Sequence, residues 1–327
     1  MNDYFSGKRV LITGGVGFIG SRLAAALVAE NAVVTLIDSM IPQYGASLAN
    51  VREIEDQVRI NFSDIRDRHS LGFLVRDQDV VFSLAGQVSH TDSMSDPMTD
   101  LEINCRAQLS LLEACRRENS TARIIFASTR QIYGRPQFLP VTEEHPLNPT
   151  DVNGVNNVAA EMYYKLYAQA YGMSTFSLRL TNTYGPGMDI RTKSKGFLGV
   201  FVNRVLRGEP IRVFGSGEQK RDFTYVSDVV DALLLAAKHT DLRGAAFNLG
   251  NKSVYSLLEV IEVMSRIKKL EYSCVPFPED YSRIEIGDYF GSYQKYNSAT
   301  GWAPQVSLEE GLEKTFEFFE ENPDRWM

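Results

Sequence analysis

The stretch "RVLITGGVGFIGSRLAAALVAEN" (residues 9–31) decides the fold. A short apolar run ends in glycines, and residues 21–31 then show the apolar spacing of a helix. Gly14, Gly17 and Gly20 lie between the two segments. Glycines permit a tight turn and let the backbone approach a pyrophosphate, while the helix start offers N–H groups to the anion. The stretch therefore predicts a dinucleotide-binding turn at the beginning of an α/β domain.

The second apolar run, residues 32–38, ends in Asp38. In dinucleotide-binding folds, an acidic residue at this strand end accepts hydrogen bonds from the hydroxyls of the adenosine ribose. A carboxylate there would repel the 2′-phosphate of NADP, and no arginine directly follows it. We therefore expect NAD rather than NADP as the cofactor.

Apolar runs and helical stretches alternate along the first half of the chain. Further apolar runs occur at 58–67, 79–86, 122–134 and 174–180, with helical stretches at 100–118 and 153–171. Such alternation is typical of a parallel sheet with helices on both faces. We expect an α/β fold built on a Rossmann-type, doubly wound parallel sheet.

The alternation breaks after residue 181. Residues 181–196 and 216–228 have the composition of loops, and only short elements separate them. We expect residues 1–180 to form an NAD-binding Rossmann domain, with some later segments returning to it. Residues 181–327 are expected to form a smaller mixed α/β C-terminal domain, in which long loops grip a substrate.

The composition excludes several classes of function. The chain has 327 residues, 44% of them hydrophobic and 23% charged, with a net charge of −7. A negative net charge argues against a sequence-independent nucleic-acid binder, which needs a basic surface. The three cysteines are scattered and give no zinc signature, so we expect no metal. No apolar run approaches the length of a membrane span and no secretory signal is visible, so we expect a soluble cytoplasmic protein.

Several longer motifs follow one another in an order that is known from one protein family. They are "TGGVGFIG" (13–20), "SDIRD" (63–67), "VFSLAGQVS" (81–89), "ASTRQIYG" (127–134), "RLTNTYGP" (179–186), "VFGSGEQKRDFTYVSDVVDA" (213–232) and "FNLGN" (247–251). With Asp38, they make nearly the whole chain resemble the extended short-chain dehydrogenase/reductase family. Within that family, the chain is most similar to the NAD-dependent epimerases and dehydratases of nucleotide sugars.

The resemblance implies a set of NAD contacts. Asp64 and Ile65 would meet the adenine, and Asn104 matches a position that supports the active-site backbone. The full set is Gly14, Gly17, Phe18, Ile19, Gly20, Asp38, Asp64, Ile65, Leu84, Ala85, Gly86, Asn104, Ser128 and Asn157.

The resemblance also implies a nucleotide-sugar substrate, held by residues 181–327. Asn182, Arg221 and Arg283 match diphosphate contacts, and a planar guanidinium can hold phosphate oxygens bidentately. Thr129 and Arg130 are expected on the sugar side of the site. From the residues alone, a surface ion pair is the preferred interpretation of either arginine, and only the resemblance favours the diphosphate contact. The family's dimers join through two helices, so we expect a homodimer formed by the stretches 100–118 and 153–171.

The family's catalytic pair is missing. Its members use a tyrosinate base whose pKa is lowered by a lysine at i+4 on the same helix face. Asn153 and Asn157 stand at these two positions, and an amide neither takes a proton at neutral pH nor carries a charge. We expect Thr129 to polarise the reacting hydroxyl and the two asparagines to orient the sugar ring and the cofactor. Arg130 and Gln131 replace the acid pair of the 4,6-dehydratases, so water elimination is not expected.

Three explanations for the missing pair stay open. His90 could be the base, since the usual imidazole pKa suits the task, or it could be a loop histidine without a role. The ligand or ordered water could move the proton instead. The protein could also bind cofactor and nucleotide sugar with little chemistry. The leading hypothesis is an epimerase that moves a hydride at the sugar, at C4. The alternative is a catalytically weak NAD/nucleotide-sugar binding protein with a regulatory or assembly role.

Overall fold

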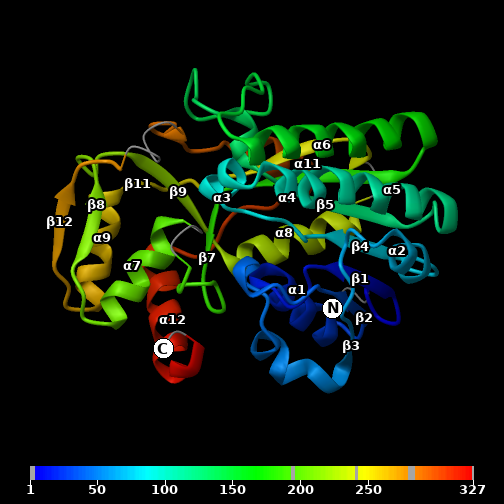
Figure 1. Ribbon diagram of the computed structural model, residues 1–327, viewed down its shortest axis with the longest axis horizontal. Coiled ribbons are helices and arrows are strands. Elements are labelled where there is room, and N and C mark those ends of the chain that lie inside the picture. Colours follow the sequence, from blue (N-terminus) through cyan, green and yellow to red (C-terminus); the bar gives the residue numbers. More distant parts are fainter. Residues whose placement is uncertain (1–3, 193–195, 240–241, 279–283, 326–327) are drawn as a thin grey trace.

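The computed structural model describes residues 4–192, 196–239, 242–278 and 284–325. A large twisted sheet with helices on both sides fills one end of the molecule, and smaller sheets with further helices fill the other (Figure 1). No helix within these ranges combines the length and apolar content that a membrane span needs.

The large sheet has seven parallel strands in the order β10-β6-β5-β4-β1-β2-β3. Its strands are β1 (Arg9–Thr13), β2 (Val33–Ile37), β3 (Val58–Asn61), β4 (Val80–Ser83), β5 (Arg123–Thr129), β6 (Ser174–Leu180) and β10 (Ala246–Leu249). The strand order reverses between β1 and β4, and open α/β sheets bind ligands at such a switch point. The predicted Rossmann-type sheet is confirmed.

Two helical layers cover this sheet because its strands are apolar on both faces. Val10 and Ile12 of β1 are buried in one core, and Leu11 between them is buried in another. The helices α1 (Phe18–Ala29) and α8 (Val226–Lys238) pack together over the first core. The second core lies under α2 (Arg68–Leu74), α5 (Ala107–Glu118) and α6 (Val152–Tyr171).

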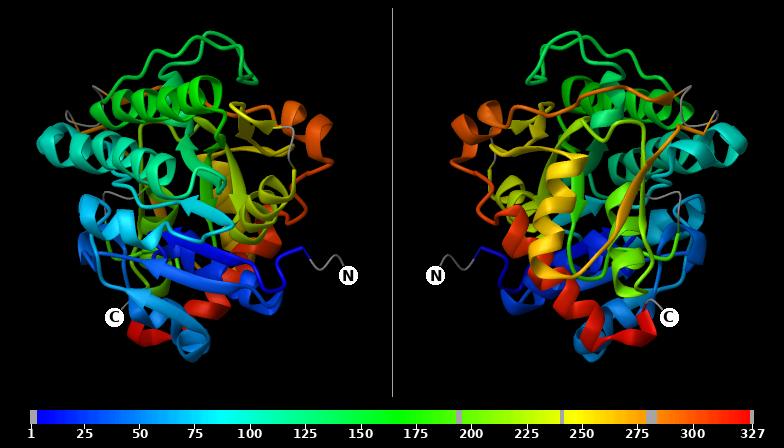
Figure 2. Two further views of the ribbon diagram at one scale, coloured as in Figure 1. Left: turned by 90° about the vertical axis from the view of Figure 1, so that its right-hand side faces the viewer. Right: turned by 90° about the vertical axis from the view of Figure 1, so that its left-hand side faces the viewer.

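The later part of the chain has its own apolar core. Its elements are β7 (Asn182–Tyr184), β8 (Ile211–Phe214), β9 (Lys220–Tyr225), β11 (Val254–Ser256), β12 (Tyr272–Val275), α7 (Phe197–Leu206), α9 (Leu257–Ile267) and α12 (Leu308–Glu321). They gather at one end of the molecule, where α9 and β12 face the viewer in the right-hand view of Figure 2. Since α8 and β10 lie with the first sheet, the chain does not divide simply in sequence, and the boundary at residue 180 stays a prediction.

Two segments expected as loops contain strands. Residues 182–184 pair in parallel with residues 223–225, joining β7 to β9. Phe223 and Tyr225 are buried in the core of this part, and that burial overrides the loop-like composition around them.

The expected helix over 100–118 is a composite. It consists of α4 (Pro97–Leu101), a π-helical turn η3 (Glu102–Arg106) and α5. Single π turns inside helices often mark functional positions, and this one carries Asn104. The remaining short elements are α3 (His90–Ser95), α11 (Gln294–Thr300), η1 (Pro42–Tyr44), η2 (Leu48–Gln57), η4 (Arg130–Tyr133) and η6 (Pro323–Arg325).

Candidate active site

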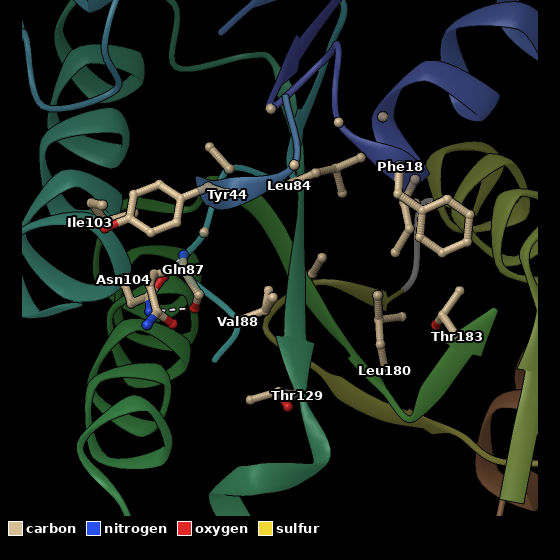
Figure 3. Close-up of a pocket in the computed structure, with 18 of the residues that line it drawn as sticks. Phe18, Tyr44, Leu84, Gln87, Val88, Ile103, Asn104, Thr129, Leu180 and Thr183 are labelled. Atoms are coloured by element: carbon tan, nitrogen blue, oxygen red, sulfur yellow. Dashed lines mark hydrogen bonds between the residues drawn. The ribbon is translucent and has the colours of Figure 1, made fainter. Parts of the chain in front are cut away.

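A cavity of about 400 Å³ runs along the carboxyl ends of the sheet strands, from the glycine turn to β7. Figure 3 shows side chains converging on it from both parts of the chain, among them Phe18, Leu84, Thr129 and Thr183. Every site residue expected from the sequence that the structure describes lines this cavity, with the exception of Arg221. Arg283 lies outside the described residues.

The glycine turn is shaped by close backbone packing. Gly14 has φ +70°, and a Cβ there would lie 3.0 Å from the backbone of Ala85. A Cβ on Gly20 would lie 2.2 Å from the carbonyl oxygen of Gly14, so no larger residue fits. Helix α1 begins after Gly17 without a side-chain cap, which leaves its first-turn N–H groups available to an anion.

Asp38 ties the end of β2 to the glycine turn. Its two oxygens accept hydrogen bonds from the backbone N–H groups of Val16 at 3.2 Å and Met40 at 3.0 Å. Burial is the main cause that raises the pKa of this carboxyl. Asp64, next along the cavity, forms a two-point ion pair with Arg66 that lowers the pKa of the Asp64 carboxyl. The glycine cradle, the open helix start and the carboxylate at the end of β2 together fit a dinucleotide.

Asn104 stabilises the loop after β4 through two hydrogen bonds to the backbone of Gln87. Its Oδ1 accepts from the backbone N–H of Gln87 at 3.0 Å, and its Nδ2 donates to the carbonyl of the same residue at 2.8 Å. Figure 3 shows the two residues facing each other. This two-sided contact fixes the backbone just before His90.

A buried carboxylate lies beneath the same loop. Asp100 has no exposed surface, and its oxygens accept from the amides of Asn104 at 3.0 Å, Asn153 at 3.1 Å and Asn156 at 2.7 Å. Asn153 also donates to the carbonyl of Gln87 at 2.6 Å. A buried charge needs such donors, since without them its desolvation would be costly. The sequence analysis does not predict this cluster, because Asn153 and Asn156 of α6 lie more than 50 positions from Asp100 in the chain.

Asn157 and Thr129 lie on the neighbouring wall. Asn157 donates its amide to the carbonyl of Asn153 at 2.9 Å and to the Asn153 Oδ1 at 3.2 Å. The Thr129 hydroxyl accepts from the backbone N–H of Gln131 at 3.2 Å. Ser128, behind it, donates to Glu161 at 2.9 Å. The two asparagines therefore support each other and the backbone, while Thr129 keeps its hydroxyl at the cavity.

His90 stands at the first position of α3 with 32% of its side chain exposed. Its Nδ1 contacts the carboxylate of Asp151, and its Nε2 contacts the side-chain amide of Gln131. Asp151 is the N-cap of α6, where its other oxygen accepts from the Gly154 N–H at 2.7 Å. The sequence alone predicts no role for Asp151 at the site. An acidic residue before a helix signals an N-cap, but nothing local signals a partner 61 positions away.

The arginines of the substrate side differ in their surroundings. Arg130 stacks on Tyr289, with 5.1 Å between guanidinium carbon and ring centre, and its buried Nη1 has no hydrogen-bond partner among the described residues. Arg221 is buried and donates to Glu285 at 3.1 Å and to the carbonyl of Gly287. Burial, with the nearby Arg130 cation, lowers the pKa of Arg221 to about 10.

Tyr44 is the one tyrosine among the described residues that line the cavity. It follows β2 and also borders a second, smaller cavity with Arg66 and Asp96. Figure 3 shows that its ring lies away from Thr129. In this region the described residues hold no group of His, Cys, Asp and Glu side chains arranged to bind a metal.

The comparisons with known proteins agree with this geometry. The model of the NAD dependent epimerase/dehydratase family matches residues 10–250. The putative UDP-glucose 4-epimerase of Methanocaldococcus jannaschii is 30% identical over 319 residues, which span 96% of this chain and 99% of the relative.

Two solved structures are similar over nearly their whole length. The UDP-glucose 4-epimerase of Thermotoga maritima, solved with UDP-glucose, is 30% identical with a TM-score of 0.86, covering 96% of this chain and 99% of that one. The UDP-glucose 4-epimerase of Thermus thermophilus, solved with NAD, is 30% identical with a TM-score of 0.85 and the same coverage. This protein belongs to the NAD dependent epimerase/dehydratase family, with NAD as its cofactor.

Proposed function

We propose that the protein is a nucleotide-sugar epimerase that moves a hydride at the sugar, at C4, with His90 as the base. The observation that carries the proposal is the position of His90, whose ring lies on the cavity wall beside Gln131 and whose far nitrogen contacts a buried carboxylate. A histidine so placed can take and return one proton at the nitrogen that faces Gln131. Tyr44, the one tyrosine among the described lining residues, lies apart from Thr129 in Figure 3 and does not compete for this role.

The proposed NAD contacts follow the cavity from one end to the other. Backbone N–H groups of the glycine turn would hold the pyrophosphate, Asp38 the adenosine ribose, and Asp64 with Ile65 the adenine. When bound, NAD supplies a reversible hydride acceptor. Asn104 and Ser128 line the same cavity and support it through hydrogen bonds to Gln87 and Glu161.

At the end of the cavity near Thr129, some residues transfer the proton and others support them. His90 Nε2 takes the proton of the sugar hydroxyl, and the Thr129 hydroxyl donates a hydrogen bond to the same oxygen. Asn153 and Asn157 replace the family's tyrosine and lysine as neutral supports. Asn153 holds the loop that precedes His90, and Asn157 holds Asn153. Amide groups can support the site by hydrogen bonding, but they cannot transfer protons.

The substrate diphosphate is proposed to lie toward Asn182, Arg130 and Arg221. The Nη1 of Arg130 supports this placement: it has no hydrogen-bond partner in the part of the chain that the structure describes, and a buried cationic donor of this kind favours an anionic ligand. Arg221 reaches such a ligand only if its contacts with Glu285 and Gly287 give way. The role proposed for Arg283 concerns a residue outside the described ranges.

We also propose a homodimer, in the cytoplasm. Val155, Met162 and Leu166 are 50–57% exposed on α6, and Met98 of the adjacent α4 is 63% exposed. Their spacing on α6 places them along one side of the helix, as an apolar strip that a second subunit could cover. The free cysteines suit a reducing compartment.

A binding protein with little catalysis is the alternative. It is favoured by the hydrogen bonds that the side-chain amides of Asn153 and Asn157 donate to protein partners, which leave neither NH2 group to donate to a substrate. The test is to mix the NAD-loaded protein with UDP-, dTDP-, GDP- and CDP-sugars, following reduced-nicotinamide absorbance and the epimeric products. Absorbance change with product formation supports the epimerase. Binding of a sugar with no change in either signal supports the binding protein.

A further inference from the structure

Three segments that are distant in sequence meet at the imidazole of His90. The ring belongs to the first turn of α3, Asp151 caps α6, and Gln131 lies in the turn η4 after β5. Both ring nitrogens are occupied, Nδ1 by the carboxylate and Nε2 by the amide. The ring therefore has one orientation, defined from both sides.

The carboxylate of Asp151 divides its two oxygens between two tasks. Oδ1 accepts from the Gly154 N–H at 2.7 Å and caps the helix, while Oδ2 faces His90 Nδ1. Only 2% of this side chain is exposed, so water does not compete for either contact. An ionised carboxylate can only accept hydrogen bonds, and Nδ1 must then carry the ring proton.

The contact with Gln131 indicates whether His90 Nε2 carries a proton. The Gln131 amide group can donate to Nε2 only if that nitrogen carries a lone pair. Its Oε1 is buried and has no hydrogen-bond partner among the described residues. Turning the amide would bring this oxygen to Nε2 and satisfy it, but only when Nε2 carries a proton. The same side chain can therefore serve the imidazole before and after it gains a proton.

We propose that Asp151 is a positioning residue that holds His90 with its proton on Nδ1 and its lone pair on Nε2, and that Gln131 partners both protonation states. The inference rests on the proposed function, because it assigns the groups that prepare the proposed base. In the step, the Gln131 amide gives up Nε2 to the sugar hydroxyl, the O–H bond of that hydroxyl breaks and an Nε2–H bond forms. Bound NAD would accept the hydride from the carbon that carries this hydroxyl. The imidazolium that results lies against Asp151, and the proton returns to oxygen when the hydride returns to carbon. Carboxylates orient catalytic histidines in this way in serine hydrolases.

Asp151→Asn separates positioning from capping. Asparagine is as good an N-cap as aspartate, so the helix should keep its start and the melting temperature should change little. The neutral amide can donate as well as accept and no longer requires the proton on Nδ1. We expect hydride transfer to fall by about 10²-fold or more, within the range for loss of a well-prepared base. Asp151→Ser, which also caps, is the second variant in case the first does not fold.

The direct measurement is nitrogen NMR of histidine-labelled protein, which needs no substrate. The chain has four histidines, and the His90 signals are those missing in His90→Gln. We expect a neutral ring protonated on Nδ1 in the wild type, and a shift toward Nε2 protonation in Asp151→Asn. Protonation on Nε2 in the wild type, or no change in the variant, would overturn the proposal.

Gln131→Glu tests the second part of the proposal, the role of Gln131. A carboxylate at this position offers only acceptors, so Nε2 should acquire a proton and hydride transfer should be lost. Wild-type rates in this variant would refute the role of Gln131. Loss of hydride transfer in His90→Gln but wild-type rates in Asp151→Asn would overturn the role of Asp151 and leave the proposed function standing. Wild-type rates in His90→Gln would instead overturn His90 as the base.

Discussion

Asn153 donates its side-chain amide to the carbonyl oxygen of Gln87 at 2.6 Å, across 66 positions of sequence. This bond joins α6 to the loop after β4. The same amide also donates to the buried Asp100, so the residue acts as a brace between two helices and the loop. These hydrogen bonds keep the loop before His90 in place.

Asn153→Ala should lower both stability and activity. Removing a donor from the buried Asp100 carboxylate should cost about 1–3 kcal/mol in the free energy of unfolding. Asn156→Ala is the matched control, because Asn156 donates to the same carboxylate but is not among the described residues that line the cavity. Denaturant unfolding should show similar losses for the two variants, and sugar turnover should fall only for Asn153→Ala. Equal turnover losses would show that Asn153 acts through stability alone.

NAD affinity should depend on pH through Asp38. Burial raises the pKa of this carboxyl, and only its ionised form accepts strongly from both ribose hydroxyls. NAD binding therefore favours the ionised form, so affinity should fall as the pH is lowered from neutral toward the raised pKa. Asp38→Ala should weaken binding at neutral pH by about 10-fold or more and flatten the pH dependence, as calorimetry would show. Unchanged affinity in the variant would remove the ribose assignment.

Arg130 should contribute to nucleotide-sugar binding. Its buried Nη1 has no partner within the described ranges, and pairing it with a phosphate should be worth about 1.5–3 kcal/mol. Arg130→Gln should therefore weaken binding of the preferred nucleotide sugar by roughly 10-fold or more, with NAD affinity kept. Arg212→Gln, on the exposed side of β8, is the control for lost charge. Equal effects of the two substitutions would argue for a general charge effect.

The apolar strip on α6 should hold the dimer together. Leu166→Lys would place a charge where the second subunit is expected to pack, and light scattering after size exclusion should show a shift from dimer to monomer. Phe73→Lys on α2 is the control, since Phe73 is 71% exposed on another helix. A wild-type protein that runs as a monomer, or a variant that stays dimeric, would contradict this surface.

The parts of the site that depend on local sequence could be predicted, and those that depend on long-range packing could not. Gly14 and Asp38 follow strands of the sheet directly, so chain order fixes their place at its carboxyl edge. Asp100 gives no such signal, because two of its three amide partners, Asn153 and Asn156, reach it only when α4 and α6 pack. Asp151 could be predicted as a cap but not as the partner of His90.

The most direct test of the central claim is rapid mixing of the NAD-loaded protein with the nucleotide sugar that it binds best, in wild type and His90→Gln. With His90 as the base, the wild type should show reduced nicotinamide within one turnover. The variant should lose about 10²–10⁴-fold in that rate while keeping its affinity for the sugar. An equal rate in the two proteins would contradict the claim.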